Sequence, residues 1–291
     1  MEGKGRITGH TGLLALIGSP VGHSGSPAMY NYSFEKLGLD YAYVAFDIKV
    51  EEVKAALDAM RLFHMRGCNV TMPCKTEAAK YMDELSPAAR IIGAVNTIVN
   101  EDGKLIGHMT DGEGFVGNLR DHGIEIKGKK ITVAGGGGAA TAIQVQCALD
   151  GAREISIFNI KDDFFERTLE TAEKIRKEVP GIVVNVYDIA DTAKMTEEIQ
   201  SSDIFANATI VGMKPMDDQS VVKDLSAFRP GLVVADAVYN PEETKLLREA
   251  KEAGCTCVGG KGMLLWQGVA AFKLYTGQDM PVEDVKKLFF S

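Results

Sequence analysis

The sequence has few cysteines, no long apolar run and no excess of basic residues. The five cysteines are odd in number and lack CxxC spacing, which favours reduced thiols over disulfides or a metal site. No apolar run approaches the ~18 residues that a membrane span needs. The first residues also lack the basic-then-apolar order of a signal peptide. We therefore expect a cytoplasmic protein with no membrane partner.

Charge and histidine content argue against two further classes of protein. The chain has 32 Lys and Arg against 40 Asp and Glu, a net charge of -8 at pH 7. Nucleic-acid binding depends on clustered cations that neutralise phosphates, so we expect no nucleic-acid partner. The five histidines are scattered without HExxH-like spacing, which disfavours a metal-assisted alcohol dehydrogenase. We expect no metal site.

Apolar runs of strand length alternate with amphipathic helical patterns along the 291 residues. The strand-like runs are 13–17, 41–46, 95–99, 130–134 and 154–158. Helical spacing is shown by two groups, Val53, Ala56, Leu57 and Met60, and Leu169, Ala172, Ile175 and Val179. This order predicts an α/β fold with a mostly parallel sheet, and the length predicts two domains.

A glycine-rich turn separates a predicted strand from a predicted helix in the second half of the chain. The turn comprises Gly135, Gly136, Gly137 and Gly138. Turns without side chains let backbone amides approach a pyrophosphate, and a helix N-terminus offers it unsatisfied N–H groups. Asp162 follows the next predicted strand, near the offset at which an acid meets the adenosine ribose. The spacing predicts a dinucleotide fold, although a glycine-loop methyltransferase would also place an acid there.

Polar side chains in the first half of the chain lie where strands are expected to end. Ser24 and Ser26 lie on a loop before a helix, where a Ser that precedes Pro is a favoured N-cap. Thr71 and Lys75 follow another strand, and a single lysine there is more often a surface residue than a catalyst. Asn96 lies in a third strand, where an unpaired amide would cost ~1–3 kcal/mol. Either backbone groups or a polyol ligand should therefore pair with it.

In combination, these motifs resemble the shikimate dehydrogenase family over nearly the whole chain. The motifs are HSxSP at 23–27, NVTxPxK at 69–75, AVNT at 94–97, TDGxG at 110–114, GxGG at 135–138 and GxGMLxxQ at 260–267. The resemblance implies an NAD(P)-dependent oxidoreductase of the chorismate pathway that acts on a CH–OH group of shikimate or quinate. The stretches FNIKDDFF, NATIVGMKP and GMLLWQG resemble the NAD-using quinate/shikimate branch of the family.

The resemblance also implies residue roles. Lys75 and Asp111 match the catalytic pair, in which Lys75 transfers a proton when hydride leaves the carbinol carbon and Asp111 orients it. The substrate-binding residues that it implies are Ser24, Ser26, Thr71, Lys75, Asn96, Asp111, Tyr239 and Gln267. The dinucleotide-binding residues that it implies are Gly135, Gly136, Gly137, Gly138, Ala139, Asn159, Lys161, Asp162, Thr209, Val238, Tyr239, Gly260 and Met263.

The residues after the second strand of the predicted dinucleotide fold favour NAD, with NADP as the alternative. NADP-dependent members of the family present an Arg after Asn159 that clamps the 2′-phosphate, whereas this chain has Ile160. Asp162 would repel that phosphate, and Lys161 offers a single positive charge. In the turn, Gly136 stands where the family usually has Ala.

Two domains are expected, a substrate domain of residues 1–110 plus 262–291 and a Rossmann-type domain of residues 111–261. The C-terminal helices should return to the first domain because Gln267 must reach the substrate, and the ligands should meet in the cleft between domains. Gly107 and Gly112 indicate either a hinge or simple turns near the boundary. The basic stretch 127–130 is interpreted as a solvated turn.

The expected partners are a small-molecule substrate and a dinucleotide, and the sequence leaves the oligomeric state open, with a homodimer as the candidate assembly. A noncatalytic nucleotide sensor is a further alternative. Such a sensor would keep the glycine turn but would not need Lys75 and Asp111.

Overall fold

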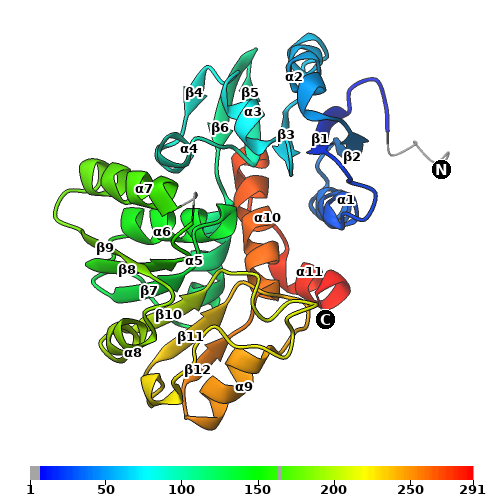
Figure 1. Cartoon of the computed structure of the whole chain (residues 1–291). Helices are drawn as coiled ribbons and strands as arrows, with labels where there is room; N and C mark the ends of the chain where they lie inside the picture. The colour runs from blue at the N-terminus through cyan, green and yellow to red at the C-terminus, as the bar shows by residue number, and fades with distance from the viewer. Residues whose placement is uncertain (1–6, 163–164, 291) are drawn as a thin grey trace. The chain divides into compact units, whose positions relative to one another are not determined.

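The computed structural model describes residues 7–162 and 165–290, which divide between two compact units (Figure 1). Unit 1 comprises Met1–Thr110 and Gly268–Ser291, and unit 2 comprises Asp111–Gln267. Each unit contains a six-stranded sheet and helices. The structure confirms the predicted α/β fold class. Each of the two units has its own sheet and its own helices.

The sheet of unit 1 has the strand order β2-β1-β3-β5-β6-β4. Its strands are β1 (Gly12–Gly18), β2 (Tyr41–Asp47), β3 (Gly67–Val70), β4 (Glu84–Leu85), β5 (Thr97–Glu101) and β6 (Lys104–His108). The pairs β1/β2, β1/β3 and β4/β6 are parallel, whereas β5 runs antiparallel to β3 and β6. Its helices are α1 (Ser26–Leu37), η1 (Val50–Glu52), α2 (Val53–Leu62), α3 (Lys75–Ala79), α4 (Pro87–Ile92) and α11 (Val282–Phe289).

Aromatic side chains form much of the core of unit 1. Tyr30 of α1 stacks on Tyr43 of β2 with ring centroids 4.5 Å apart, and Phe272 stacks against Tyr30 and Phe34. Phe272 and Tyr275 belong to α10 (Lys261–Thr276), far along the chain from α1. The Tyr30 hydroxyl also donates to the carbonyl of Gly268 at 3.1 Å. Burial of such rings contributes about 1.5–3 kcal/mol each, which ties the C-terminal segment to unit 1.

The sheet of unit 2 is parallel throughout, with the order β12-β11-β10-β7-β8-β9. Its strands are β7 (Lys130–Ala134), β8 (Glu154–Asn159), β9 (Val183–Asp188), β10 (Ile204–Asn207), β11 (Val233–Asp236) and β12 (Thr256–Val258). Its helices are α5 (Asp111–Asp121), α6 (Gly138–Leu149), α7 (Phe165–Glu178), α8 (Thr192–Gln200), η2 (Leu225–Ala227), α9 (Lys245–Glu252) and the first part of α10. The strand order reverses between β7 and β10, as it does in doubly wound dinucleotide folds.

Two predicted element boundaries are wrong. The strand expected at 95–99 begins at Thr97, because the Val95 N–H donates to the carbonyl of Lys75 in α3 instead of to the sheet. The helix expected after the glycine turn begins inside that turn, at Gly138. Element ends are where sequence patterns carry the least information, since one or two residues at each end lack regular partners.

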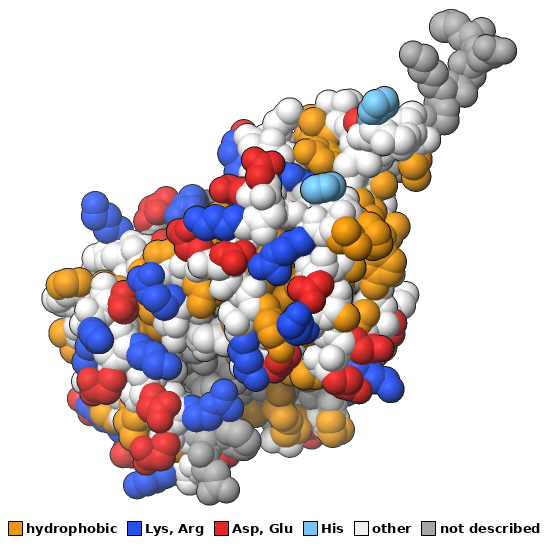
Figure 2. Space-filling view, turned by 90° about the horizontal axis from the view of Figure 1, so that it is seen from above, with side chains coloured by type: hydrophobic (Ala, Val, Ile, Leu, Met, Phe, Trp, Pro, Cys, Tyr) orange, Lys and Arg blue, Asp and Glu red, His pale blue; other side chains and the backbone are white. Residues whose placement is uncertain are grey.

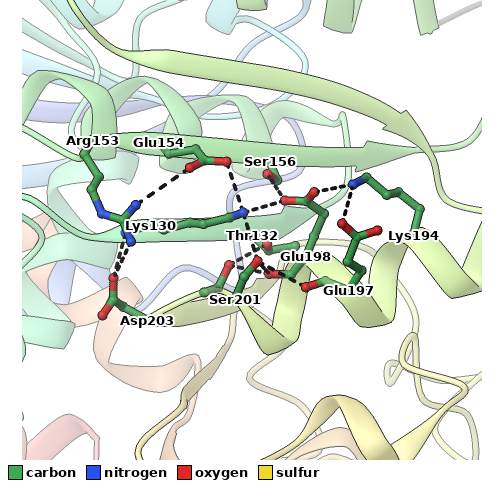
Figure 3. A network of polar contacts seen from close by, with 11 residues as sticks. Lys130, Thr132, Arg153, Glu154, Ser156, Lys194, Glu197, Glu198, Ser201 and Asp203 are labelled. Atoms are coloured by element: carbon green, nitrogen blue, oxygen red, sulfur yellow. Dashed lines mark hydrogen bonds and ion pairs between the residues drawn. The ribbon is translucent and has the colours of Figure 1, made fainter.

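Lys130 corrects the interpretation of 127–130 as a solvated turn. It is the first residue of β7 and is buried, and its Nζ lies 2.7 Å from Glu198 and 3.0 Å from Glu154 (Figure 3). The same Nζ donates to Ser201 at 2.9 Å. A lysine is rarely buried unless carboxylates pair with it, and here one carboxylate comes from the neighbouring strand β8 and the other from helix α8.

The surface of the protein carries both signs of charge. Figure 2 shows acidic and basic side chains interspersed over one face. All five cysteines are free thiols in the structure. Among the residues that the structure describes, no helix has both the length and the apolar character to cross a membrane.

Candidate functional site

Three chain segments of unit 1 converge at one edge of its sheet. The loop after β1, the turn after β3 and the residues before β5 meet there, because β1 and β3 are parallel and β5 is antiparallel to β3. The Thr71 N–H donates to Ile17 at 2.9 Å, the Ser19 N–H donates to Met72 at 3.1 Å, and the Val70 N–H donates to Asn96 at 2.8 Å. These backbone bonds fix the segments that carry the predicted substrate-binding residues.

Lys75 is the first residue of α3 and is half-buried. Its backbone carbonyl accepts a hydrogen bond at 3.0 Å from Val95, the neighbour of Asn96. Thr71 lies four residues earlier and is also half-buried. The structure therefore brings Thr71, Lys75 and Asn96 to the same edge, as the motifs predict, and anchors the lysine by its backbone so that its side chain can be changed without loss of that bond.

Asn96 is buried and held by two threonines that the sequence motifs do not single out for a role. Its Oδ1 accepts from the Thr110 N–H at 2.8 Å and from the Thr97 hydroxyl at 3.1 Å, and its Nδ2 donates to the Thr110 hydroxyl at 3.0 Å. The sequence predicts that either backbone groups or a polyol ligand pairs with this amide. The contacts among the described residues are to backbone and hydroxyl groups of the chain. They fix the plane of the Asn96 amide.

Asn69 extends this polar network into the core. Its Nδ2 donates to Asn96 O at 3.2 Å and to the Thr97 hydroxyl at 3.0 Å, and its Oδ1 accepts from the Tyr43 hydroxyl at 2.8 Å. Burial raises the pKa of Tyr43 well above its usual value, so the phenol remains a hydrogen-bond donor at neutral pH. The network links the edge of the sheet near Asn96 to the buried core by side-chain hydrogen bonds.

The serines of the loop after β1 do not cap α1 as predicted. Gly25 is the N-cap residue, no side chain caps the helix, and Ser26 is already within the helix. The Ser24 hydroxyl instead accepts from the Ser26 N–H at 3.2 Å. The capping interpretation fails because Pro27 occupies the second helical position, which moves the cap one residue earlier. Both hydroxyls are half-buried.

Asp111 is the first residue of α5 and therefore the first residue of unit 2. The glycines near it are packing residues, which corrects the interpretation of Gly107 and Gly112 as turn residues. A Cβ on Gly107, inside β6, would lie 2.5 Å from Val95. A Cβ on Gly112, inside α5, would lie 2.4 Å from the backbone oxygen of Ala142 in α6. Absence of a side chain lets α5 and α6 approach closely.

The four glycines of the turn after β7 divide into two pairs. Gly135 has φ +122°, and a Cβ there would lie 2.7 Å from Ala208 O, while one on Gly136 would lie 2.2 Å from Asn159 Nδ2. Gly137 and Gly138 are exposed, and a Cβ on either would meet none of the described residues within 4 Å. The first two positions require glycine because a side chain there would clash with packed atoms of the protein. The second pair leaves open space above the backbone.

The N-terminus of α6 fits the pyrophosphate of a dinucleotide. Gly137 is its N-cap, no side chain caps the helix, and the first turn has no acidic residue. Gly137, Gly138 and Ala139 are exposed at this end, and the unsatisfied N–H groups and the dipole of a helix N-terminus favour an anion there. Gln144 of α6 is a residue that the motifs do not reveal. It is buried, and its Nε2 donates to Gly135 O at 2.9 Å, which holds the start of the turn.

The end of β8 is where the sequence predicts that the adenosine half of a dinucleotide would bind. Asn159 donates from Nδ2 to the Thr168 hydroxyl of α7 at 2.9 Å. Ile160, Lys161 and Asp162 are exposed beyond it. The chain thus presents one exposed cation and one exposed carboxylate where the ribose of a dinucleotide would lie.

The other side of unit 2 is formed by the loops that follow β10, β11 and β12. Thr209 follows β10, whereas Val238 and the half-exposed Tyr239 follow β11. Gly260 lies against this second loop, because a Cβ on it would be 2.6 Å from Val238 O, and its carbonyl accepts from the Met263 N–H at 3.0 Å. The predicted residues of this side are therefore neighbours in space.

Gln267 is the last residue of unit 2, in α10, and its Nε2 donates to Leu264 O at 3.1 Å. A Cβ on Gly114 of α5 would lie 2.7 Å from the Gln267 backbone nitrogen. Of the predicted substrate-binding residues, Ser24, Ser26, Thr71, Lys75 and Asn96 thus belong to unit 1, and Asp111, Tyr239 and Gln267 belong to unit 2.

A buried polar group in unit 2, which the sequence motifs do not reveal, consists of Asn207, Asp236 and Thr244. All three lie at or just after the carboxyl ends of β10 and β11. A signal for them existed. Asn207 and Asp236 each end an apolar run of strand length, where a polar residue commonly faces a ligand edge. Their mutual contact could not be read from sequence because 29 residues separate them.

Comparisons with known proteins agree with these two halves. Residues 16–98 match the model of the shikimate dehydrogenase substrate binding domain, and residues 260–288 match the model of the shikimate 5'-dehydrogenase C-terminal domain. A shikimate dehydrogenase (NADP(+)) of Listeria monocytogenes serotype 4b is 50% identical over 285 residues, with 98% of both chains covered. A quinate/shikimate dehydrogenase of Escherichia coli strain SMS-3-5 is 45% identical, covering 97% of this chain and 98% of that one.

A solved structure is similar over the same length. The crystal structure of shikimate 5-dehydrogenase from Listeria monocytogenes in complex with shikimate and NAD superposes with a TM-score of 0.95 at 49% identity. The match covers 98% of this chain and 99% of that chain. The predicted resemblance is thereby confirmed, and the chain belongs to the shikimate dehydrogenase family.

Proposed function

We propose that this chain is an NAD(P)-dependent oxidoreductase that reversibly converts shikimate to 3-dehydroshikimate, quinate to 3-dehydroquinate, or both. The observation that supports it most directly is the gathering of Thr71, Lys75 and Asn96 at one edge of the sheet of unit 1. A small acid with several ring hydroxyls needs such donors and acceptors for its orientation. The 50% identity to a shikimate dehydrogenase over 98% of the chain supports the same assignment.

In this proposal Lys75 moves the proton of the reacting hydroxyl. When bound, NAD(P) supplies the acceptor for the hydride of the carbinol carbon. In the oxidative direction the amine form of Lys75 takes the hydroxyl proton, and in the reductive direction its ammonium form returns that proton to the oxygen. Asp111 orients the lysine and the same hydroxyl. Ser24, Ser26, Thr71 and Asn96, with Tyr239 and Gln267, hold the carboxylate and the remaining hydroxyls.

Dinucleotide binding is assigned to unit 2. Its pyrophosphate would lie at the N-terminus of α6, where the described residues leave space beside Gly137 and Gly138 and provide no side-chain cap. The adenosine half would lie by Asn159, Lys161 and Asp162, and the other half by Thr209, Val238, Tyr239, Gly260 and Met263. Substrate binding is assigned mainly to unit 1.

We further propose that NAD is preferred over NADP. Ile160 is 60% exposed at the position where a guanidinium would clamp a 2′-phosphate, and Asp162 adds an exposed carboxylate beside it. The related Listeria monocytogenes protein carries NADP(+) in its name, whereas NAD is present in the crystal structure of the Listeria shikimate 5-dehydrogenase. The ratio of kcat/KM for NAD to that for NADP tests this proposal, and a clear preference for NADP contradicts it.

The test of the main proposal is oxidation of shikimate, and separately of quinate, followed by the absorbance of the reduced nicotinamide. Lys75→Met should lower kcat by about 10²-fold or more while NADH still binds, because a general acid–base group contributes about 10² to 10⁴-fold. Lys80→Met is the matched control. Lys80 lies at the end of the same helix, α3, and pairs on the surface with Glu77 at 2.6 Å.

Each outcome separates a different alternative. Near-normal turnover by Lys75→Met contradicts the role of Lys75. Binding of NADH by the wild-type protein without oxidation of either acid favours a noncatalytic nucleotide sensor. Binding of S-adenosylmethionine without binding of NADH favours a glycine-loop methyltransferase.

A further inference from the structure

A buried carboxylate that no sequence motif explains lies beside one half of the proposed dinucleotide site. Asp236, Asn207 and Thr244, here called the Asp236 cluster, are respectively 2%, 0% and 0% exposed. Asp236 ends β11, Asn207 ends the neighbouring parallel strand β10, and Thr244 precedes α9. The cluster is therefore at the carboxyl edge of the sheet of unit 2, on the same edge as the glycine turn after β7.

The Asp236 carboxylate accepts three hydrogen bonds. Its Oδ2 accepts from the Thr244 hydroxyl at 2.6 Å, and its Oδ1 accepts from Asn207 Nδ2 at 2.9 Å and from the Val238 N–H at 3.0 Å. Burial raises the pKa of Asp236, and these hydrogen bonds act in the opposite direction. Three donors from three segments meet on one small carboxylate, so its position fixes theirs.

The cluster holds two loops that carry predicted dinucleotide-binding residues. In the loop after β10, the Thr209 hydroxyl donates to Asn207 Oδ1 at 2.7 Å and the Thr209 N–H donates to the same atom at 3.1 Å. In the loop after β11, the bond to the Val238 N–H sets the backbone just before Tyr239. The two loops also pack together, because a Cβ on Gly212 would lie 3.3 Å from the Thr244 methyl group.

The strand order indicates which half of the dinucleotide these loops would face. β8, which leads to Asn159, lies on one side of β7, and β10 and β11 lie on the other side. With the pyrophosphate at the N-terminus of α6, the adenosine half lies over β8. The opposite half, with the nicotinamide, therefore lies over the loops after β10 and β11.

We propose that Asp236 is a positioning residue for the nicotinamide half of the dinucleotide, acting through Thr244, Asn207 and the Val238 amide and not by touching the ligand. The inference rests on the proposed function of unit 2 as the dinucleotide-binding unit. It predicts a selective effect. Loss of the cluster weakens binding of ligands that contain nicotinamide and leaves binding of their adenosine diphosphate part intact.

The test compares four single variants of the full chain by calorimetric titration with NADH and with ADP. Thr244→Val removes the hydroxyl at nearly constant volume, Thr244→Ser keeps the hydroxyl, and Asp236→Asn changes the carboxylate itself. Thr132→Val is the matched control. Thr132 is equally buried in the same sheet, and its hydroxyl bonds only to Ser202 among the contacts described, at 2.8 Å. Unfolding midpoints are measured for each variant.

We expect Thr244→Val and Asp236→Asn to bind NADH about tenfold or more weakly and ADP within about twofold of the wild type, because a lost hydrogen bond to a charged group corresponds to about tenfold. Thr244→Ser should stay close to the wild type, and Thr132→Val should lose stability without loss of NADH binding. If Asp236→Asn does not fold, the two Thr244 variants decide. Equal weakening of NADH and ADP, or unchanged NADH binding, overturns the proposal.

The proposed enzymatic function can fail separately. If the wild-type protein binds NADH but oxidises neither shikimate nor quinate, the substrate assignment is wrong, and the NADH-to-ADP comparison still decides the role of Asp236. If the protein oxidises shikimate and the Thr244→Val variant binds NADH normally, only the positioning role is wrong.

Discussion

Replacement of Glu198 by Gln should destabilise unit 2 in a way that depends on pH. The Glu198 carboxylate lies 2.7 Å from Lys130 Nζ and 2.8 Å from Lys194 Nζ, and it accepts from the Ser156 hydroxyl at 2.7 Å (Figure 3). Its side chain is only 6% exposed. Burial alone would raise its pKa, but the hydrogen bonds from Lys130, Lys194 and Ser156 outweigh burial and lower the pKa to about 2.

The magnitude follows from the pKa of Glu198 in the two states. A carboxyl group that titrates near 4.5 in the unfolded chain and about 2 in the folded protein contributes about 3 kcal/mol at pH 7. Because the folded pKa is the lower one, this stability is present above pH 4.5 and is lost as the pH falls toward 2. At about pH 3.5 roughly 2 kcal/mol should remain. Breaking a buried pair by removal of one partner costs a similar amount, about 3–5 kcal/mol.

The assay is urea unfolding of the wild type and Glu198→Gln between pH 7 and pH 3.5. Glu197→Gln is the matched control, because Glu197 pairs with the same Lys194 at 3.1 Å but its side chain is 69% exposed. An exposed pair contributes about 1 kcal/mol or less, so this control should differ little from the wild type at any pH. A Glu198→Gln protein that is as stable as Glu197→Gln at pH 7, or a difference that grows in acid, would refute the reasoning.

Two further predictions concern the dinucleotide site. Ile160→Arg combined with Asp162→Ser should shift the ratio of kcat/KM for NADP to that for NAD toward NADP by about tenfold or more. The reason is that a guanidinium adds charge-assisted hydrogen bonds to a 2′-phosphate. An unchanged ratio would show that other residues set the cofactor specificity. Gly136→Ala should cost about 1–3 kcal/mol of stability and weaken ADP binding, because the added Cβ would displace the Asn159 amide from Thr168. Thermal unfolding measures the stability and titration with ADP measures the binding. Wild-type values in both measurements would contradict the prediction.

Much of the fold could be predicted because its signals are local. The apolar runs that became β1, β2, β7 and β8 are bounded by turn residues, and their strand length and composition are visible in the chain itself. The glycine turn after β7 was readable for the same reason, since strand, turn and helix follow one another directly. Its division into two packing glycines and two open ones was not readable, because it depends on Ala208 and Asn159.

The residues that the sequence analysis misjudged depend on distant partners. Lys130 looks like part of a basic turn until helix α8 brings Glu198, 68 residues later in the chain, against the start of β7. Gly112 looks like a turn residue until α6 is laid against α5. Asp236 carries no motif at all, because its role lies in contacts to Asn207 and Thr244. In each case the residue is of an ordinary type, and its neighbours in the folded structure decide what it does.

The two ends of the strands in unit 2 therefore have separate roles. The ionic network lies at the amino ends and the proposed dinucleotide site at the carboxyl ends, so the two roles can be tested separately. β7 begins at Lys130, in the ionic network, and ends at Ala134, beside the glycine turn. Four residue steps of a strand span about 13 Å. That distance is far beyond hydrogen-bond contact, so a change at the Lys130 end does not touch the glycine turn directly. Glu198→Gln should thus lower stability with little change in NADH affinity, whereas Thr244→Val, at the opposite edge, should change NADH affinity. The reverse pattern would mean that the two edges are energetically coupled through the sheet.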